Sequence, residues 1–474
     1  MIRFLHIADV HLGNRRYNLE ERAQDFFRAW IDVLVNYAVP RKLDFVLIAG
    51  DFFNARKVDP QTMNHAMIGL QTLREAGIPV VAIEGNHDQH EAVSSFSWMR
   101  SLSQWGFLKL LEPSRDAEGR MELVPWSEEE CCGSYIDIAG ARIFGSHWYG
   151  TSANAAMGLL SEGIRRARHE GLFHILMLHT DVEGQLKRPI PALSVERLKE
   201  LRSLVDYVAL GHTHKRFEVE NWAFNPGSLE ACSIDEYREE RGFYLVEVDD
   251  ERNIKAEHIR DYVQRPFQRL SFDVSGVLDA EAVHAGVMET VKRDARRHDE
   301  NSDAPAPIIE ISLKGHLGFK NSLLDMSRIR EEAREWTRAL HVMVRNQSVP
   351  VEYAVAADLD GDTSRPVRER RIIEDLIARD TRYRDRAPEM AALVLEAKRL
   401  ALTDESPSAI LDLIEQKLDA GVRRTSETPR ALLHELEAAA AAAAASDEPE
   451  IASASASALQ AIERNAATAV TSEK

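Results

Sequence analysis

The chain has 474 residues, a length that predicts two or three domains because a single hydrophobic core rarely grows so large. Hydrophobic residues make up 44% and charged residues 29%, which is typical of a soluble globular protein, and no apolar run of about 18 residues indicates a membrane span. The formal net charge of −18 argues against non-specific electrostatic binding to nucleic acid, although bound cations can create local positive charge on an acidic protein.

The N-terminal stretch MIRFLHIADVHLG is apolar but short, and it lacks a small-residue cleavage site, so we expect a buried strand and not a signal peptide. The chain has three cysteines, Cys131, Cys132 and Cys232, and none of them has CxxC spacing. This pattern argues against a disulfide framework and against a structural zinc site, and it fits a reducing cytoplasm.

Short apolar runs alternate with amphipathic segments from residue 1 to about 262, which predicts an α/β domain. Several of these runs are nearly continuous in Val, Ile, Leu and Phe, as expected for strands that are buried on both faces. The expected strands cover residues 2–8, 44–50, 79–85, 134–146, 173–179, 205–212 and 242–248. Residues 19–38 and 62–77 are expected to form helices, the second ending at Gly77.

A smaller α+β module is predicted for residues 265–350. Strands are expected at 269–274, 307–313 and 340–346, and helices at 279–297 and 325–339. The stretch AADLDGDTSRP then has the composition of a linker; it begins like a calcium-binding loop but lacks a convincing closing Glu.

Residues 366–420 are predicted to be helical, because apolar residues recur there at helical spacing. They form three stripes: Ile372, Ile373, Leu376 and Ile377; Leu393, Val394, Ala397 and Leu400; Ile410, Leu413, Ile414 and Leu418. Either these stripes pack on the main body or they bind a partner. Residues 425–474 are of low complexity and rich in Ala, and we expect a disordered tail.

Side chains that can bind metal ions recur at the carboxyl ends of five expected strands, where ligand sites form in open α/β sheets. They are Asp9 and His11, then Asp51, then Asn86 with His87 and Asp88, then His179, and finally His212 and His214. Extended backbone would place both side chains of a D-x-H or H-x-H pair on one side. The glycines in GD, GNH and GH are expected to allow tight turns that project the next side chain inward.

The candidate ligands combine two carboxylates, one carboxamide and several imidazoles, a set that suits manganese, iron or zinc better than calcium or magnesium. Seven candidate ligands are enough for two ions. A pair of ions about 3.5–4 Å apart can stabilise the attacking and leaving oxygens of a phosphoryl displacement and can activate a bridging water.

These motifs, taken in order, resemble the calcineurin-like metallophosphoesterase superfamily, whose pattern runs D-x-H, GD, GNH[DE], H and GHxH. The flanking stretches HIADVHLGNRRYNLEERAQDFFRAW, GHTHKRF, NPGSLE and RPFQRLSFDV are similar to the SbcD-type nucleases of double-strand-break repair. The resemblance covers about residues 1 to 345, and it implies a metallophosphoesterase β-sandwich flanked by helices, a smaller capping domain and a C-terminal helical extension.

The resemblance also implies roles for individual residues. Asp9, His11, Asp51 and His214 would hold one ion, and Asp51, Asn86, His179 and His212 would hold the other, with manganese expected at both positions. His87 would stabilise the transition state or protonate the leaving oxygen, and Asp88 would orient His87. Asn54 stands where archaeal relatives often have His. The partners implied are DNA, a second copy of the chain and an SbcC-type coiled-coil ABC ATPase, which residues 366–420 would contact.

Two other functions stay open at this point. The core motifs also fit a small-molecule nucleotide or cyclic-nucleotide phosphoesterase, and the chain could be largely a structural scaffold for the ATPase. Seven other histidines are expected to be structural or surface residues: His6, His65, His169, His174, His284, His298 and His316. His90, just past the GNHD motif, and His147, in GSHWYG, which could line the cleft, are closer cases, but neither fits the ligand pattern. The Arg-rich run at 365–386 has interleaved acidic residues, which favours a solvated helix over a DNA contact.

Overall fold

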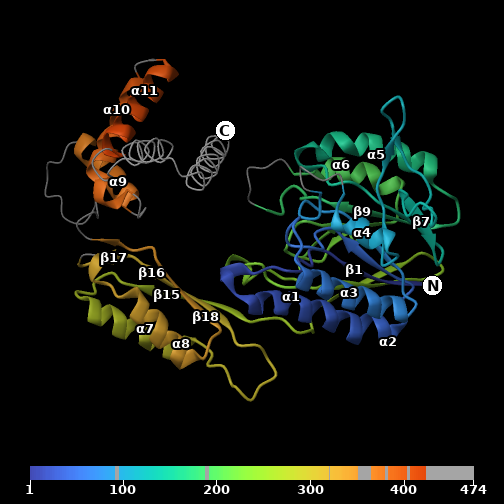
Figure 1. Cartoon of the computed structure of the whole chain (residues 1–474), viewed down its shortest axis with the longest axis horizontal. Helices are drawn as coiled ribbons and strands as arrows, with labels where there is room; N and C mark the ends of the chain where they lie inside the picture. The colour runs from blue at the N-terminus through green and yellow to red at the C-terminus, as the bar shows by residue number, and fades with distance from the viewer. Residues whose placement is uncertain are drawn as a thin grey trace, which may run out of the picture. The chain divides into compact units, whose positions relative to one another are not determined.

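The computed structural model describes residues 1–90, 96–186, 192–319, 321–350, 365–378, 383–402 and 406–422. They fall into two compact units, which divide between Ser348 and Val349 (Figure 1). Residues 356–364 of the linker predicted at 356–366, and the tail predicted at 425–474, lie outside the described residues, whereas Arg365 and Pro366 belong to a helix. Among the helices that the structure describes, none is both long and apolar enough to cross a membrane.

The first unit contains two six-stranded mixed sheets. The first sheet has the order β14-β13-β1-β2-β3-β4, and its strands are β1 (Ile2–Ile7), β2 (Phe45–Ala49), β3 (Val80–Ile83), β4 (Lys109–Leu110), β13 (Phe243–Val248) and β14 (Ile254–Ile259). The second sheet has the order β11-β12-β10-β9-β8-β7, and its strands are β7 (Tyr135–Ile138), β8 (Ala141–Phe144), β9 (Phe173–His179), β10 (Tyr207–Gly211), β11 (Phe217–Val219) and β12 (Ala223–Asn225). A short hairpin joins β5 (Ser114–Arg115) to β6 (Met121–Glu122).

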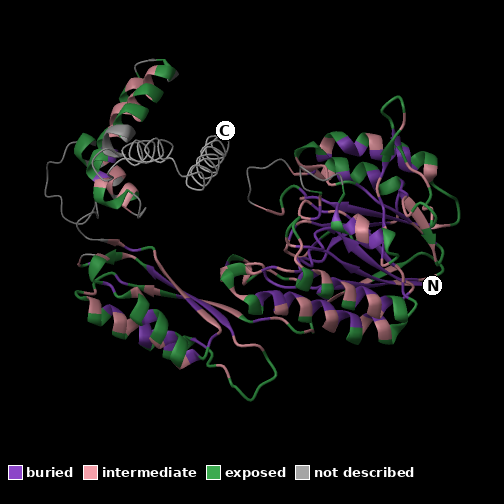
Figure 2. Ribbon diagram, viewed as in Figure 1, coloured by how far each residue is buried: buried purple, intermediate pink, exposed green. Residues whose placement is uncertain are grey.

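The two sheets pack face to face, and buried aromatic and aliphatic side chains of both sheets form one shared core. The strands of the sandwich are mostly buried in Figure 2. Phe4 of the first sheet stacks on Phe45 with ring centroids 5.0 Å apart, and it meets the edge of Tyr207 from the second sheet at 5.2 Å. Because the inner strands are buried on both faces, they are apolar along their whole length, which is the pattern that the sequence shows.

Helices cover the outer face of each sheet (Figure 1). The first sheet is covered by α1 (Glu20–Val33), α2 (Val39–Arg41), α3 (Pro60–Glu75) and α4 (Trp98–Gln104), and the second by α5 (Ala153–Ala167) and α6 (Val195–Lys199). The predicted α/β sandwich flanked by helices is therefore confirmed. The helix expected at 19–38 is interrupted, because its α-helical part ends at Val33 and a π-helical turn follows to Ala38.

A three-stranded parallel sheet follows within the same unit, in the order β15-β16-β18. Its strands are β15 (Phe267–Asp273), β16 (Ile308–Lys314) and β18 (His341–Asn346). The same segment of chain contains α7 (Ala280–Asp294), α8 (Met326–Thr337) and the two-residue strand β17 (His316–Leu317), which is not part of this sheet. Side chains between Leu270 and Val344 form a hydrophobic core of their own, separate from the cores of the sandwich.

Three helices make up the described part of the second unit: α9 (Arg365–Ala378), α10 (Ala387–Leu402) and α11 (Pro407–Val422); the two-residue strand β19 (Val349–Pro350) precedes them. Lys398 of α10 pairs with Glu369 of α9. Met390 and Ala391 are buried, whereas Leu376, Val394 and Leu411 are largely exposed.

Candidate metal centre

All seven candidate ligands lie at or just beyond the carboxyl ends of five strands, and these strands come from both sheets of the sandwich. Asp9 and His11 follow β1, Asp51 follows β2, and Asn86 follows β3. His179 ends β9, and His212 and His214 follow β10. Since β1, β2 and β3 are parallel to one another, as are β9 and β10, each sheet presents its ligands at one edge.

The backbone at four of these positions is left-handed: φ is 52° at Asp9, 49° at His11, 52° at Asp51 and 87° at His212. The extended alternation expected for the D-x-H and H-x-H pairs is therefore not how the fold presents these side chains. Hydrogen bonds between the loops hold the turns, because Asp9 N donates to Gly50 O at 3.1 Å and His11 N donates to Asp51 O at 3.0 Å. Left-handed non-glycine residues are uncommon and cluster at functional sites.

The glycines before the ligands are required mainly because a β-carbon would not fit there, and less because the backbone needs a positive φ. A β-carbon on Gly85 would lie 2.1 Å from Asp51 Oδ1, and one on Gly211 would lie 2.1 Å from Ala49 O. Only Gly50 also has a positive φ, 88°, and its β-carbon would lie 2.3 Å from His179 Nδ1. Any side chain at these positions would push the ligand loops apart.

One group of ligands gathers around His11 and His214. Their Nε2 atoms lie 3.0 Å apart, and Asp9 Oδ1 lies 4.0 Å from the first and 3.9 Å from the second. His214 Nδ1 lies 3.0 Å from Glu236 Oε1, a contact in which the ring nitrogen donates, so its Nε2 lone pair faces His11. Two donors on one cation are about 3.0–3.4 Å apart at ordinary bond lengths, which this pair satisfies.

A second group gathers around His179. Its Nε2 lies 3.3 Å from Asp51 Oδ2 and 3.3 Å from Asn86 Oδ1, and His212 Nδ1 lies 2.9 Å from that same Asn86 oxygen. His179 Nδ1 donates to Ala49 O at 2.8 Å, which leaves Nε2 as the metal-capable atom. Asp51, His179 and His212 lie close enough together to hold one ion.

Asp51 lies between the two groups, because its Oδ2 is 3.9 Å from His11 Nε2 as well as 3.3 Å from His179 Nε2. Burial alone lowers the pKa of His179, but the Asp51 carboxylate outweighs it and raises that pKa to about 9. Burial raises the pKa of Asp9 to about 6. Carboxylates buried among imidazole lone pairs form a set that a divalent cation would stabilise, so the donors fit metal ions.

His87 lies beside the group around His11 and is not one of the seven candidate ligands, although one of its ring nitrogens, one of His11 and a carboxylate oxygen of Asp51 all lie within 4.8 Å of one another. Its backbone N donates to Asp51 Oδ1 at 2.8 Å, and its ring meets that of His11 edge-on with centroids 5.0 Å apart. His87 Nδ1 donates to the backbone carbonyl of Asn54 at 2.6 Å. This contact leaves Nε2 free to meet a substrate.

The hydrogen bonds of Asp88 differ from those expected. Its buried carboxylate accepts hydrogen bonds from the backbone amides of Phe52 at 3.1 Å, Phe53 at 2.9 Å and Gly85 at 3.0 Å. The expectation that Asp88 orients the His87 ring is corrected: the Asn54 carbonyl holds that ring, and Asp88 ties the loop after β2 to the loop after β3.

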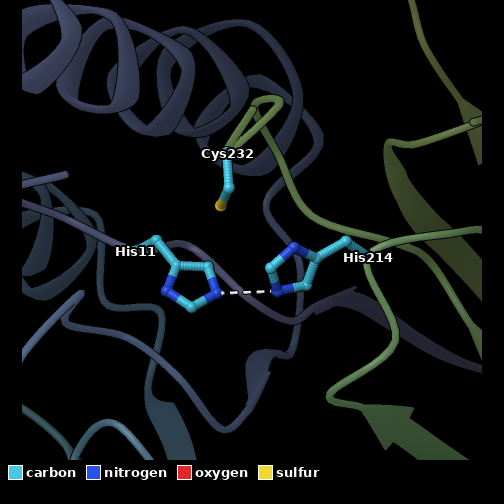
Figure 3. A group of neighbouring side chains, drawn as sticks. All are labelled: His11, His214 and Cys232. Atoms are coloured by element: carbon cyan, nitrogen blue, oxygen red, sulfur yellow. Dashed lines mark hydrogen bonds between the residues drawn. The ribbon is translucent and has the colours of Figure 1, made fainter. Parts of the chain in front are cut away.

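Three further side chains reach this region, and the sequence patterns did not identify them. Asp181 Oδ2 lies 3.7 Å from His212 Nε2, Glu236 bonds His214, and the Cys232 thiol lies beside His11 and His214 (Figure 3). Asp181 comes two residues after His179, in HTD, which was a usable signal. Glu236 and Cys232 lie in an irregular segment after β12, where no periodicity marks them.

Several histidines left out of the ligand set have other surroundings among the described residues. His147 Nε2 donates to Pro113 O at 2.7 Å, and His90 is exposed. His6 is fully buried, with Nε2 donating to Leu210 O at 3.0 Å and Nδ1 accepting from the Tyr207 hydroxyl at 2.9 Å.

Comparison with known proteins matches part of the chain to a family and most of it to several relatives. Residues 2–216 match the family described as calcineurin-like phosphoesterase. The chain is 26% identical over 369 residues to the DNA double-strand break repair protein Mre11 of Sulfurisphaera tokodaii, which covers 76% of this chain and 85% of that one. It is 31% identical over 265 residues to the protein of that name from Archaeoglobus fulgidus, covering 52% and 57%. For the Aeropyrum pernix protein the identity is 25% over 353 residues, covering 73% and 80%.

Proposed function

Since residues 2–216 belong to the calcineurin-like phosphoesterase family, which makes this chain a metal-dependent phosphoesterase, we propose that it is a nuclease that processes DNA ends in double-strand-break repair. The observation that carries the proposal is the convergence of seven residues with oxygen and nitrogen donors, with Asp51 between the two groups. The relatives named for break repair support DNA as the substrate, because the similarity extends well beyond the motifs to most of the chain.

Asp9, His11, Asp51 and His214 would hold one divalent ion, and Asp51, Asn86, His179 and His212 would hold the other, with manganese as the expected metal. When bound, the ions would supply an activated water and neutralise the charge that grows on the phosphate. They would also give this acidic chain, with its net charge of −18, a local positive site for a phosphodiester.

His87 would act directly on the substrate. The Asn54 carbonyl holds its Nδ1–H, and the ring adjoins the group that contains His11. Its Nε2 would donate a hydrogen bond or a proton to the phosphate or to the leaving oxygen, which contributes typically 10²–10⁴-fold to such reactions. Asp88 would act on the reaction only by fixing the two loops that carry Asp51 and His87.

The organisation of the chain fits this function. We propose a nuclease domain at 1–262, a capping domain at 265–350 that restricts which DNA ends reach the site, and a helical region at 366–420 for an SbcC-type coiled-coil ABC ATPase. Apolar side chains exposed on α9, α10 and α11, such as Leu376, Val394 and Leu411, suit a helix-in-groove contact. A homodimer is part of this proposal.

Purified protein should be assayed with Mn²⁺ on linear duplex DNA, on hairpin DNA and on a small chromogenic phosphodiester, with the Asp51→Asn variant as the control for contaminating nucleases. We expect cleavage of both DNA substrates by the wild type and none by Asp51→Asn. Turnover of the small ester alone would favour a small-molecule phosphoesterase. If the wild type cleaves none of the three substrates but co-purifies with a coiled-coil ATPase, the result would favour a structural scaffold.

A further inference from the structure

Cys232 brings a sulfur atom to a site that otherwise has only oxygen and nitrogen donors. Its Sγ and one ring nitrogen each of His11 and His214 all lie within 4.8 Å of one another. Figure 3 shows the thiol pointing toward the pair of imidazoles, whose facing nitrogens lie 3.0 Å apart. Two donors on one ion can lie no farther apart than the sum of one metal–sulfur and one metal–nitrogen bond, about 4.4 Å, so atoms gathered within this range need only a small movement to share an ion.

The fold holds this thiol in place through a single carboxylate. Glu236 Oε2 accepts a hydrogen bond from Cys232 N at 2.8 Å, and Glu236 Oε1 accepts one from His214 Nδ1 at 3.0 Å. The cysteine backbone and the His214 ring are therefore fixed relative to each other, much as carboxylates orient metal-binding imidazoles elsewhere.

The chain on both sides of Cys232 is also anchored. Arg22 Nη2 donates to Ala231 O at 2.5 Å, and Ile234 N donates to the Tyr17 hydroxyl at 2.7 Å. Contacts on either side of the residue keep the thiol next to the imidazoles instead of leaving it on a free loop.

We propose that Cys232, as a thiolate, is a further ligand of the ion that His11 and His214 hold; this rests on the proposed metal centre. On binding, the S–H bond breaks, a sulfur–metal bond forms and the proton passes to solvent. Thiolate ligands favour softer ions such as zinc over manganese. The Asp51, Asn86 and His179 side has no such donor among the described residues, so the two positions would prefer different metals.

The competing explanation is a thiol that only packs against His214. The two other cysteines provide an internal comparison, because Cys131 Sγ contacts Glu128 O at 3.5 Å and Cys132 Sγ contacts a Glu130 carboxylate oxygen at 3.6 Å, away from the ligand set.

Cobalt is the probe that separates these explanations, since a thiolate bound to Co²⁺ gives an intense near-ultraviolet charge-transfer band, whereas nitrogen and oxygen ligands give only weak visible bands. Metal-free protein should be titrated with Co²⁺ as the wild type, as Cys232→Ser and as the matched control Cys131→Ser. We expect the intense band in the wild type and in Cys131→Ser, and its loss in Cys232→Ser with the weak bands retained.

A wild-type spectrum that shows the weak bands without the charge-transfer band would overturn the thiolate ligand and leave the metal centre standing. A protein that takes up no cobalt would overturn both. Competition titrations give a second readout, because they compare two metals on the same variant and do not use an activity assay. Cys232→Ser should bind Zn²⁺ at least about tenfold more weakly than the wild type does, with Mn²⁺ affinity nearly unchanged. Equal losses for the two metals would overturn the proposal.

Discussion

Asp51 of the first sheet and His179 of the second bring Oδ2 and Nε2 to 3.3 Å from each other. Asp51 lies two residues after the end of β2, and His179 is the last residue of β9. The candidate metal centre therefore spans the interface between the two sheets and is not the property of either.

Metal ions should stabilise this fold, because they would join the two sheets. A ligand present at 100 times its dissociation constant adds about 2.7 kcal/mol to the free energy of unfolding. Adding Mn²⁺ to metal-free wild-type protein is expected to raise Tm by several degrees in a thermal scan. Asp51→Asn, which removes the carboxylate between the two groups, should lose most of the rise; a full rise in that variant would contradict the shared role of Asp51.

His87→Ala should separate catalysis from metal binding. His87 is absent from both ligand sets, so the variant should bind as many ions as the wild type, while its kcat falls by about 10²–10⁴-fold. Metal content and steady-state rates on the same preparation measure the two effects. His90→Ala, at an exposed position three residues away, is the matched control and should keep full activity. Undiminished kcat in His87→Ala would remove the catalytic assignment.

Glu236→Gln should weaken metal binding from a distance. The Glu236 carboxylate accepts the His214 Nδ1–H at 3.0 Å, and loss of such a partner typically costs 10–100-fold in metal affinity. Isothermal titration of the metal-free protein with Mn²⁺ or Zn²⁺ measures the change. The nearby substitution Glu239→Gln should leave the affinity as it is, and equal effects of the two would point to a general charge effect.

A buried ion cluster should be essential for the packing of α1 against the segment that leads into β15. Asp25 accepts from Arg22 Nη1 at 2.5 Å and from Arg265 Nε and Nη2 at 2.5 and 2.6 Å, and all three side chains are at most 5% exposed. Asp25→Ala leaves the buried Arg265 guanidinium without its carboxylate and leaves Arg22 with Glu230 alone, whose Oε1 lies 3.6 Å from Arg22 Nη2. This loss should cost about 3–5 kcal/mol in urea denaturation. Glu21→Ala, exposed on the same helix, should change stability by less than about 0.5 kcal/mol.

His6 should make stability depend on pH. Burial lowers the pKa of His6 to about 3, whereas an unfolded chain would titrate near the ordinary value of 6.5. Between these values the unfolded state binds the proton and the folded state does not, so stability falls as the pH falls, by up to about 1.4 kcal/mol per pH unit. Urea midpoints measured from pH 7.5 to pH 5 should decline more steeply for the wild type than for His6→Gln. The exposed His316→Gln should keep the wild-type slope.

The sequence predicted the buried strands well, because a strand covered on both faces must be apolar throughout. It could not predict how the strands pair: β13 returns from residue 243 to lie antiparallel to β1, with Phe4 opposite Val246, and nothing local encodes that register. The two-to-three-residue strands β4, β11 and β12 were also missed, since so short a segment has no measurable period. The six-residue strand β14 was missed as well, and the single strand expected at 134–146 is a pair of antiparallel strands, β7 and β8.

The seven candidate ligands could be found from sequence because parallel strands bring their carboxyl ends to a common edge. The reasons given for their local geometry were less accurate. Left-handed backbone at Asp9 and His11 replaces the expected alternation, and Gly85 serves close approach instead of turning. Asp88, Glu236 and Cys232 act through contacts between distant loops, which depend on the completed fold and not on spacing along the chain.

A centre built across two sheets has a consequence for how the protein is made. His11 and His214 are 203 positions apart in the chain. Most of the sandwich must therefore be synthesised before all the ligands of one ion are present. A truncated or misfolded chain would contain sequence motifs of the site, but it would lack the assembled metal centre. Phosphoesterase activity would then arise only at the end of folding, so incompletely folded chains would not hydrolyse phosphoesters in the cell.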